Sequence, residues 1–221
     1  MRRFALVLAV LPLLAACNST RPLPTVREHG ERAFNRGQYE KARADFAEYV
    51  ERNPGEPEIR LLLAKSLLAL GNPAEAAEHA SAAFHLRPMN QDAVETYARA
   101  LFESKQTTEL DRFLRAQAES NGSSDAYLRW GRYLAKSGDA DGAEHALLRG
   151  AALDGGRTIQ PQLALAEFYR SIGDKKNELR RLRTALSFDT ANDAVNARIR
   201  ELGEIPGPSL ALPPVDDQPM R

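Results

Sequence analysis

The sequence has few aromatic residues, a single cysteine and no surplus of either charge. Aromatic side chains make up 7% of the 221 residues, while alanine and leucine recur throughout, and this composition favours helices over strands. One cysteine excludes an internal disulfide and a metal site built from cysteines alone. With 30 basic residues against 30 acidic ones, the chain lacks the basic surplus that nucleic-acid binding requires.

Motifs for catalysis or cofactor binding are also missing from the sequence. Neither a phosphate-binding glycine loop nor a Gly-x-Ser-x-Gly nucleophile motif is present. We therefore expect no enzymatic activity, no cofactor, no metal and no small-molecule substrate. Asp139–Gly142 lacks the later glutamate of a calcium loop, so it is interpreted as a helix N-cap. No metal-ligand spacing links the four histidines, which are His29, His79, His85 and His145.

The first sixteen residues have the pattern of a signal peptide. Two arginines precede an apolar run over residues 4–14, which is too short to span a bilayer, and small residues follow. The segment Leu13–Cys17 resembles the lipobox of bacterial lipoproteins. That resemblance implies that residues 1–16 are removed and that the thiol of Cys17 is acylated. Residues 17–22 then form a lipidated N-terminus and a short linker.

The residue after the cysteine indicates the membrane of the cell envelope to which a lipoprotein is sorted. Asn18 stands where bacterial lipoproteins retained at the inner membrane typically carry aspartate. The lipoprotein resemblance therefore implies an anchor on the periplasmic face of the outer membrane. The acyl chains would hold the protein there without a transmembrane helix.

A six-residue sequence pattern recurs along the chain at a nearly constant spacing. Gly37–Ala42 and Gly71–Ala76 begin 34 residues apart, and each leads to a proline at the same distance, Pro54 or Pro88. Gly138–Ala143 repeats the pattern. The pattern resembles the tetratricopeptide repeat (TPR), whose unit of about 34 residues folds as two antiparallel helices. The resemblance implies an all-α fold, a right-handed TPR α-solenoid with a C-terminal capping helix.

Five units fit this period, and the third is degenerate because Lys105 replaces its turn glycine and Gly122 replaces its terminal proline. Each unit has a small residue where its paired helices should approach closely. The units begin near Leu23, Pro57, Gln91, Ser124 and Ile159. The small residues are Gly30, Ala64, Ala98, Gly131 and Ala166.

A short amphipathic segment follows the fifth unit. Residues 190–202 carry an apolar stripe with charged residues around it, which is typical of the helix that covers the last apolar face of a solenoid. Gly203 ends this helix, so the superhelix is expected over residues 23–203. The prolines of residues 204–221 predict a disordered tail, and its apolar segment Ser209–Leu212 offers the alternative of docking on a partner.

Local signals within the units predict helix starts and packing. Thr25–Glu28 and Asn72–Glu75 have the spacing of N-terminal capping residues. Trp130 is expected to pack between the paired helices of the fourth unit, and contact with a ligand is the alternative.

The repeat register places one face of each first helix on the concave surface of the solenoid, where such proteins bind partners. Apolar anchors beside cations predict an amphipathic helix or an extended segment as ligand, and an ordinary solvated face is the alternative. Some repeat domains bind the C-terminal carboxylate of a partner through lysine and asparagine donors at the positions of Glu95 and Thr96. Because Glu95 and Thr96 are not such residues, this kind of binding is not expected here. The candidate partner-binding residues are Phe34, Leu61, Lys65, Leu68, Arg99, Phe102, Leu128 and Arg132.

The whole-protein pattern resembles the TPR lipoproteins of Tad (tight adherence) and type IV pilus systems, which work with an outer-membrane secretin. The resemblance implies a scaffold that binds protein partners, such as a secretin or another pilus-assembly component, during assembly of an envelope machine. Two alternatives stay open. The chain could present a peptidase or cell-wall enzyme to its substrates, or belong to the apparatus that inserts outer-membrane proteins.

Overall fold

The structure is a computed structural model that describes residues 21–214, and within this range it consists of helices and loops. The predicted signal peptide, the lipidation site Cys17 and residues 215–221 lie outside the described residues. The α-helices of the described range are α1 (Leu23–Asn35), α2 (Tyr39–Arg52), α3 (Pro57–Ala69), α4 (Pro73–Leu86), α5 (Gln91–Glu103), α6 (Thr107–Asn121), α7 (Ser124–Ser137), α8 (Ala140–Asp154), α9 (Gln160–Ser171), α10 (Lys175–Leu186) and α11 (Asp193–Glu201). A 3-10 helix covers Pro208–Leu210.

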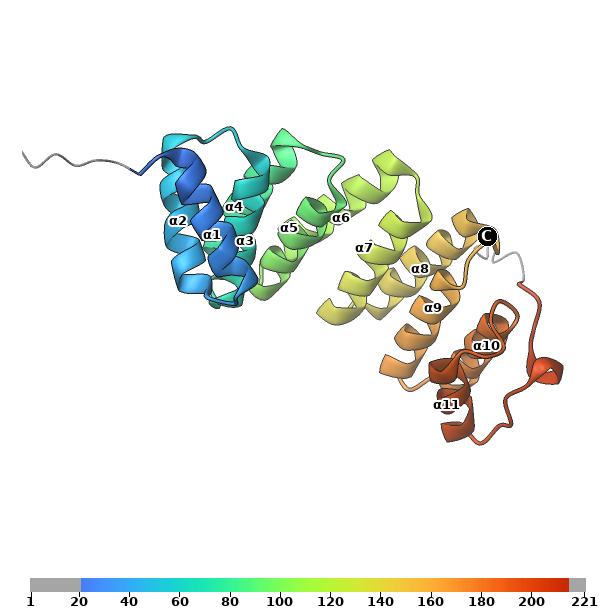
Figure 1. Cartoon of the computed structure of the whole chain (residues 1–221). Helices are drawn as coiled ribbons and strands as arrows, with labels where there is room; N and C mark the ends of the chain where they lie inside the picture. Colours follow the sequence, from blue (N-terminus) through green and yellow to red (C-terminus); the bar gives the residue numbers. More distant parts are fainter. Residues whose placement is uncertain (1–20, 215–221) are drawn as a thin grey trace, which may run out of the picture.

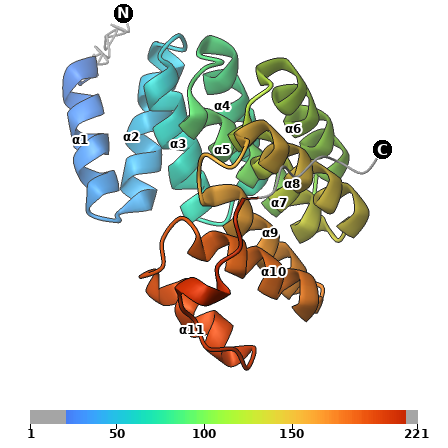
Figure 2. The ribbon, with the colours of Figure 1, turned by 90° about the vertical axis from the view of Figure 1, so that its right-hand side faces the viewer.

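The helices form antiparallel pairs that stack side by side in a curved row, from the blue N-terminal pair to the red C-terminal end (Figure 1). Figure 2 shows the same succession of pairs from the side. Four of the first helices begin at the predicted starts of their units, and α9 begins one residue after Ile159. The expected all-α solenoid of five helix pairs and a terminal helix is confirmed.

Two glycines let paired helices approach closely. A Cβ added at Gly30 in α1 would lie 2.7 Å from Cε1 of Phe46 in α2. A Cβ added at Gly131 in α7 would lie 2.7 Å from Cγ of Leu147 in α8. Because interiors are already close-packed, a larger residue at either position would displace the facing side chain. The predicted small-residue position is thus the point of closest approach in these two pairs.

The turn within the third pair keeps its geometry although its glycine is lost. Lys105 has a φ of 61°, and it is the one residue other than glycine with a positive φ in the described range. Its N–H donates to the carbonyl of Phe102 at 3.0 Å, as the N–H of Gly71 donates to the carbonyl of Leu68 at 3.1 Å. The equivalent turn glycines, all with positive φ, are Gly37, Gly71, Gly138 and Gly173.

The predicted caps differ in outcome. Asp139 caps α8, because its carboxylate accepts a bond of 2.9 Å from the N–H of Gly142. The prediction at Thr25 is wrong: α1 already begins at Leu23, so Thr25 lies inside the first turn. Asn72 precedes α4 as predicted, but its side chain makes no capping bond. Pro24 and Pro73 both lie at the start of their helices, where the fixed φ of proline suits the first turn.

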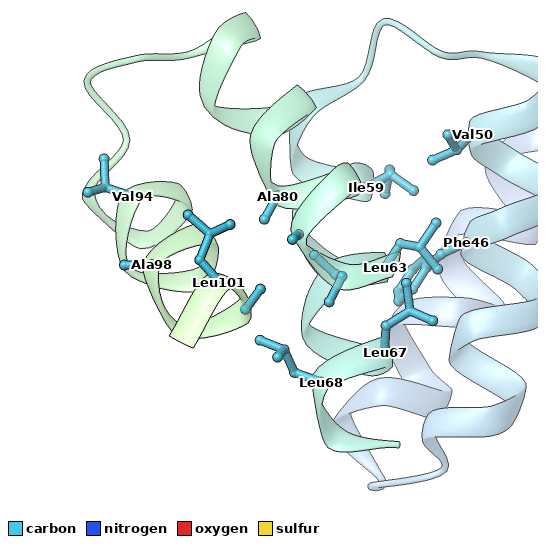
Figure 3. Packing of buried hydrophobic residues seen from close by; sticks show 14 of the residues in the cluster. Phe46, Val50, Ile59, Leu63, Leu67, Leu68, Ala80, Val94, Ala98 and Leu101 are labelled. Atoms are coloured by element: carbon cyan, nitrogen blue, oxygen red, sulfur yellow. The ribbon is translucent and has the colours of Figure 1, made fainter. Parts of the chain in front are cut away.

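The hydrophobic core runs without a break through the first three pairs (Figure 3). Phe46 from α2, Leu67 from α3 and Leu101 from α5 are at most 1% exposed. Separate clusters follow around Leu147 in the fourth pair and around Ile199 at the C-terminal end. Because each pair buries one side against the next pair, the remaining face of the first helices is left for a partner.

Residues 206–214, which belong to the tail predicted to be disordered, lie against α10, while residues 215–221 of that tail are outside the described range. The N–H of Leu212 donates to the carbonyl of Arg183 in α10 at 3.0 Å, and Nε of Arg183 donates to the carbonyl of Leu210 at 2.9 Å. Leu210 and Ala211 pack against the C-terminal cluster. We call residues 206–214 the C-terminal strap. Its prolines restrict the unfolded chain, so ordering it against an apolar face loses little entropy.

Candidate partner-binding groove

The first helices of the pairs line a groove made of successive hollows. A hollow of about 330 Å³ spans α1, α3 and α5. It brings together four of the eight predicted residues, namely Phe34, Lys65, Leu68 and Arg99. A second hollow of about 690 Å³ lies over α5 and α7, and it includes Leu128 and Arg132. Arg132 also lines a third hollow of about 310 Å³ between α7 and α9. Six of the eight predicted residues therefore line these hollows.

Three of the predicted apolar anchors are buried in the core and cannot offer much surface to a ligand. Leu61 is 7% exposed and packs against Ala83 and Ala93, while Leu68 is 6% exposed. Leu128 is 2% exposed and packs against Gly150, where an added Cβ would lie 2.9 Å from its Cδ2. These positions face the neighbouring helix because the pairs stack tightly, so the prediction of leucine anchors is corrected here.

The two phenylalanines have different surroundings. Phe34 is half-buried, makes an edge contact with Tyr39 at 5.6 Å between ring centroids, and lines the first hollow. Phe102 is half-buried and lies edge-on to Tyr133 in the next pair, at 5.8 Å. Phe102 thus joins the third pair to the fourth, and a change there would disturb packing as well as any partner contact.

The predicted cationic centre is largely neutralised by neighbouring acids. Nζ of Lys65 lies 2.5 Å from Oδ2 of Asp92, and Nε of Arg99 lies 2.6 Å from Oε1 of Glu103. Arg132 is exposed and forms no ion pair within the described residues. Of the three predicted cations, Arg132 is therefore the one available to an anionic group of a partner.

Glu95 organises the wall between the first and second hollows. Its carboxylate pairs with Nε of Arg129 at 3.1 Å and accepts a bond of 2.9 Å from the hydroxyl of Tyr133. Burial and the adjacent Glu95 raise the pKa of Tyr133 well above its usual value, so this hydroxyl stays a donor at neutral pH. Sequence reasoning placed Glu95 correctly on the groove, but it could not show these two partners.

Trp130 makes contacts beyond the fourth pair in which it was predicted to pack. Its indole N–H donates to Oδ1 of Asp111 in α6 at 2.8 Å, and the guanidinium of Arg115 lies over the ring at 5.2 Å. The ring packs against the cluster of the fourth pair and also against the core of the first three pairs, so it joins the fourth pair to the preceding one. This contact ties the degenerate third repeat to its neighbour.

Neither a metal-binding cluster nor a membrane-spanning helix occurs in the described range. Within residues 21–214, no group of three or more His, Cys, Asp or Glu side chains is placed to hold a metal ion. Over the same residues, no helix combines the length and the apolar character needed to cross a membrane.

Comparisons with known proteins agree with this geometry. The tetratricopeptide repeat family matches residues 27–88 and 61–124, and no match is found among the curated proteins. A thermophilic TPR protein of Thermus thermophilus is 22% identical with a TM-score of 0.55, over 82% of this chain and 98% of that chain. MamA of Desulfovibrio magneticus is 19% identical with a TM-score of 0.59, over 77% of this chain and 97% of that chain.

A third solved structure, YrrB, is described as a TPR protein with an unusual peptide-binding site. It is 14% identical with a TM-score of 0.53, over 81% of this chain and 92% of that chain. At sequence identities of 22% or lower, the similarity to these structures shows a shared fold alone. The chain therefore has the fold of a TPR α-solenoid.

Proposed function

We propose that this chain is a lipid-anchored scaffold that binds protein partners through its groove during assembly of an envelope machine. The observation that carries the proposal is the row of hollows along the first helices, because stacked repeats use this surface for protein binding. The peptide-binding site described for YrrB supports the same use of the fold. The lipobox-like segment Leu13–Cys17 supports attachment through an acylated cysteine.

The machine that we propose is a Tad or type IV pilus system, with an outer-membrane secretin as a partner. The support is the combination of a lipoprotein signal, an asparagine after the cysteine and a short TPR solenoid. In this arrangement the acyl chains hold the solenoid at the periplasmic face of the outer membrane, and the groove faces other components.

Site-specific crosslinking in cells tests this proposal. A photo-reactive amino acid is placed at Ala69 or Ser171, which are exposed on first helices, and at Ala44 or Ala116, which are exposed on second helices as controls. We expect discrete crosslinks from the first-helix positions to an envelope protein, identified as a secretin or a pilus component by mass spectrometry. Crosslinks that form only from Ala44 and Ala116 would contradict a partner in the groove. A peptidase as the crosslinked protein would favour the adaptor alternative.

A further inference from the structure

The hollow between α7 and α9 has an apolar floor and a charged rim, and we call it the α7–α9 hollow. Its volume is about 310 Å³. The floor consists of apolar side chains from three helices, and the rim consists of polar residues at the two edges. The floor residues are Ala135, Leu147, Ala164 and Phe168, and the rim residues are Arg132, Lys136, Glu167 and Ser171. An apolar floor with a few polar groups around it is the usual form of a specific binding site.

The charged side chains of this rim lack the partners that neutralise the rest of the groove. Arg132, Lys136 and Glu167 are exposed, and none of them forms an ion pair or side-chain hydrogen bond within the described residues. Lys136 lies 5.2 Å from the ring centroid of Tyr133, a cation–π contact that leaves its charge uncompensated.

The repeat register shows what has changed at this place. In the third repeat, Arg99 is followed one turn later by Glu103, and the two side chains pair. In the fourth repeat, Arg132 is followed one turn later by Lys136 instead. Like charges four residues apart destabilise a helix, and a carboxylate from outside would relieve that repulsion. The two cations belong to α7, whereas the acid Glu167 stands on α9 across the floor.

We propose that the α7–α9 hollow binds a segment of a protein partner in which an apolar side chain is flanked by an acidic one. The apolar side chain occupies the floor, and the acidic side chain lies between Arg132 and Lys136. The edge near Glu167 favours a basic or neutral residue on the other side of the apolar one. This inference rests on the proposed function, and it adds the chemistry of the ligand and its place in the groove.

A random peptide library provides the probe. Twelve-residue peptides displayed on phage are selected on the purified full chain in detergent, and enriched peptides are synthesised with a fluorescent label for polarisation measurements. We expect the enriched peptides to share an Asp or Glu within two residues of a Leu, Ile or Phe. An enriched set without this acidic residue, or no enrichment, would overturn the proposal.

Charge reversal gives the decisive comparison. The double variant Arg132→Glu/Lys136→Glu should weaken the selected peptide by tenfold or more, and a peptide with lysine in place of the acidic residue should regain binding to that variant. The control Arg149→Glu/Arg180→Glu changes the same charge at exposed sites on second helices, and it should alter affinity less than twofold. Equal losses in both variants, or no recovery with the lysine peptide, would refute a specific site at this rim.

Two further variants identify the occupant. Ala135→Trp fills the hollow from its floor and should abolish peptide binding while thermal unfolding stays within a few degrees of the wild type. If Ala135→Trp instead dissolves a dimer, the occupant is a second copy and the proposal fails. If peptides bind only after deletion of residues 215–221, the chain's own end is the occupant and the proposal also fails.

Failure of this inference can be told apart from failure of the proposed function. If the groove crosslinks to an envelope protein in cells and that crosslink survives Arg132→Glu/Lys136→Glu, the scaffold function stands and the α7–α9 hollow is not the recognition site. If no first-helix position crosslinks to a protein, the proposed function itself fails.

Discussion

Lys105 holds a backbone conformation that glycine would adopt without strain. Its φ of 61° lies in the left-handed region, which is roughly 1–2 kcal/mol less favourable for a residue with a Cβ. The side chain is exposed and forms no ion pair or hydrogen bond within the described range that would offset this strain. Lys105→Gly relieves the strain, but the greater conformational entropy of glycine in the unfolded chain lowers the free energy of unfolding by roughly 0.4–1 kcal/mol. We expect a net stabilisation of about 0.5–1 kcal/mol.

Urea unfolding followed by far-ultraviolet circular dichroism measures this change. With a slope of roughly 2 kcal/mol per molar urea, the midpoint should rise by about 0.3–0.5 M. Lys105→Ala is the matched control, because it removes the same charge but keeps a Cβ in the strained conformation. Its midpoint should stay close to that of the wild type. Gly71→Lys places the strain in the equivalent turn of the second pair, and its midpoint should fall.

The result that refutes this reasoning is a lower midpoint for Lys105→Gly. A lower midpoint would mean that the third turn has a different conformation from the other turns, or that Lys105 is stabilised by a contact outside the described residues. An equal rise for Lys105→Ala and Lys105→Gly would trace the gain to the lysine side chain rather than to the backbone.

Four other predictions concern packing, pH, the strap and the anchor. Gly131→Ala should lower stability by about 1 kcal/mol in the same urea assay, because overpacking against Leu147 at about 1–3 kcal/mol outweighs the roughly 1 kcal/mol gained from helix propensity. Burial, together with its bond to Glu144, raises the pKa of Tyr169 to about 12. Above pH 10 the unfolded state therefore loses this proton before the folded state does, so unfolding free energy should fall between pH 10 and 12, and less steeply in Tyr169→Phe. Deletion of residues 206–221 should lower the melting temperature by about 5 °C or more, since Leu210 and Ala211 lose their packing; an unchanged melting curve would show that the strap does not stabilise the end. Cys17→Ser should abolish incorporation of labelled fatty acid and release the protein from membranes, and label retained by the variant would contradict acylation at that residue.

The period of the fold could be read from the sequence because a few positions in each repeat are fixed by geometry. Gly30 and Gly131 stand where helices nearly touch, and Gly71 stands where the chain must take a positive φ. Such requirements are local, so they leave a mark at a constant spacing. Lys105 shows the limit of this reasoning. The repeat keeps its turn without the glycine, because the packing of neighbouring helices over-determines the backbone there.

The docking of the strap could not be predicted from the sequence for a different reason. Its prolines correctly exclude a further helix, but they do not exclude an extended segment held by main-chain bonds. Within the described residues no further α-helix follows α11, and residues 206–214 lie beside α10. Docking of this kind depends on the surface that the last repeat leaves open. The sequence of the strap alone therefore cannot predict that it docks there.

The groove shows how much of a binding site the repeat register can predict and which part depends on neighbours. The register placed Arg99 and Arg132 at equivalent positions, yet Arg99 pairs with Glu103, whereas Arg132 forms no ion pair with any residue of the range 21–214. The difference lies one turn further along, where Glu103 in one repeat corresponds to Lys136 in the next. That contrast is present in the sequence, because residues four apart on a helix share a face. A fold repeated five times therefore presents unequal surfaces, and the unpaired position is where recognition is expected to concentrate.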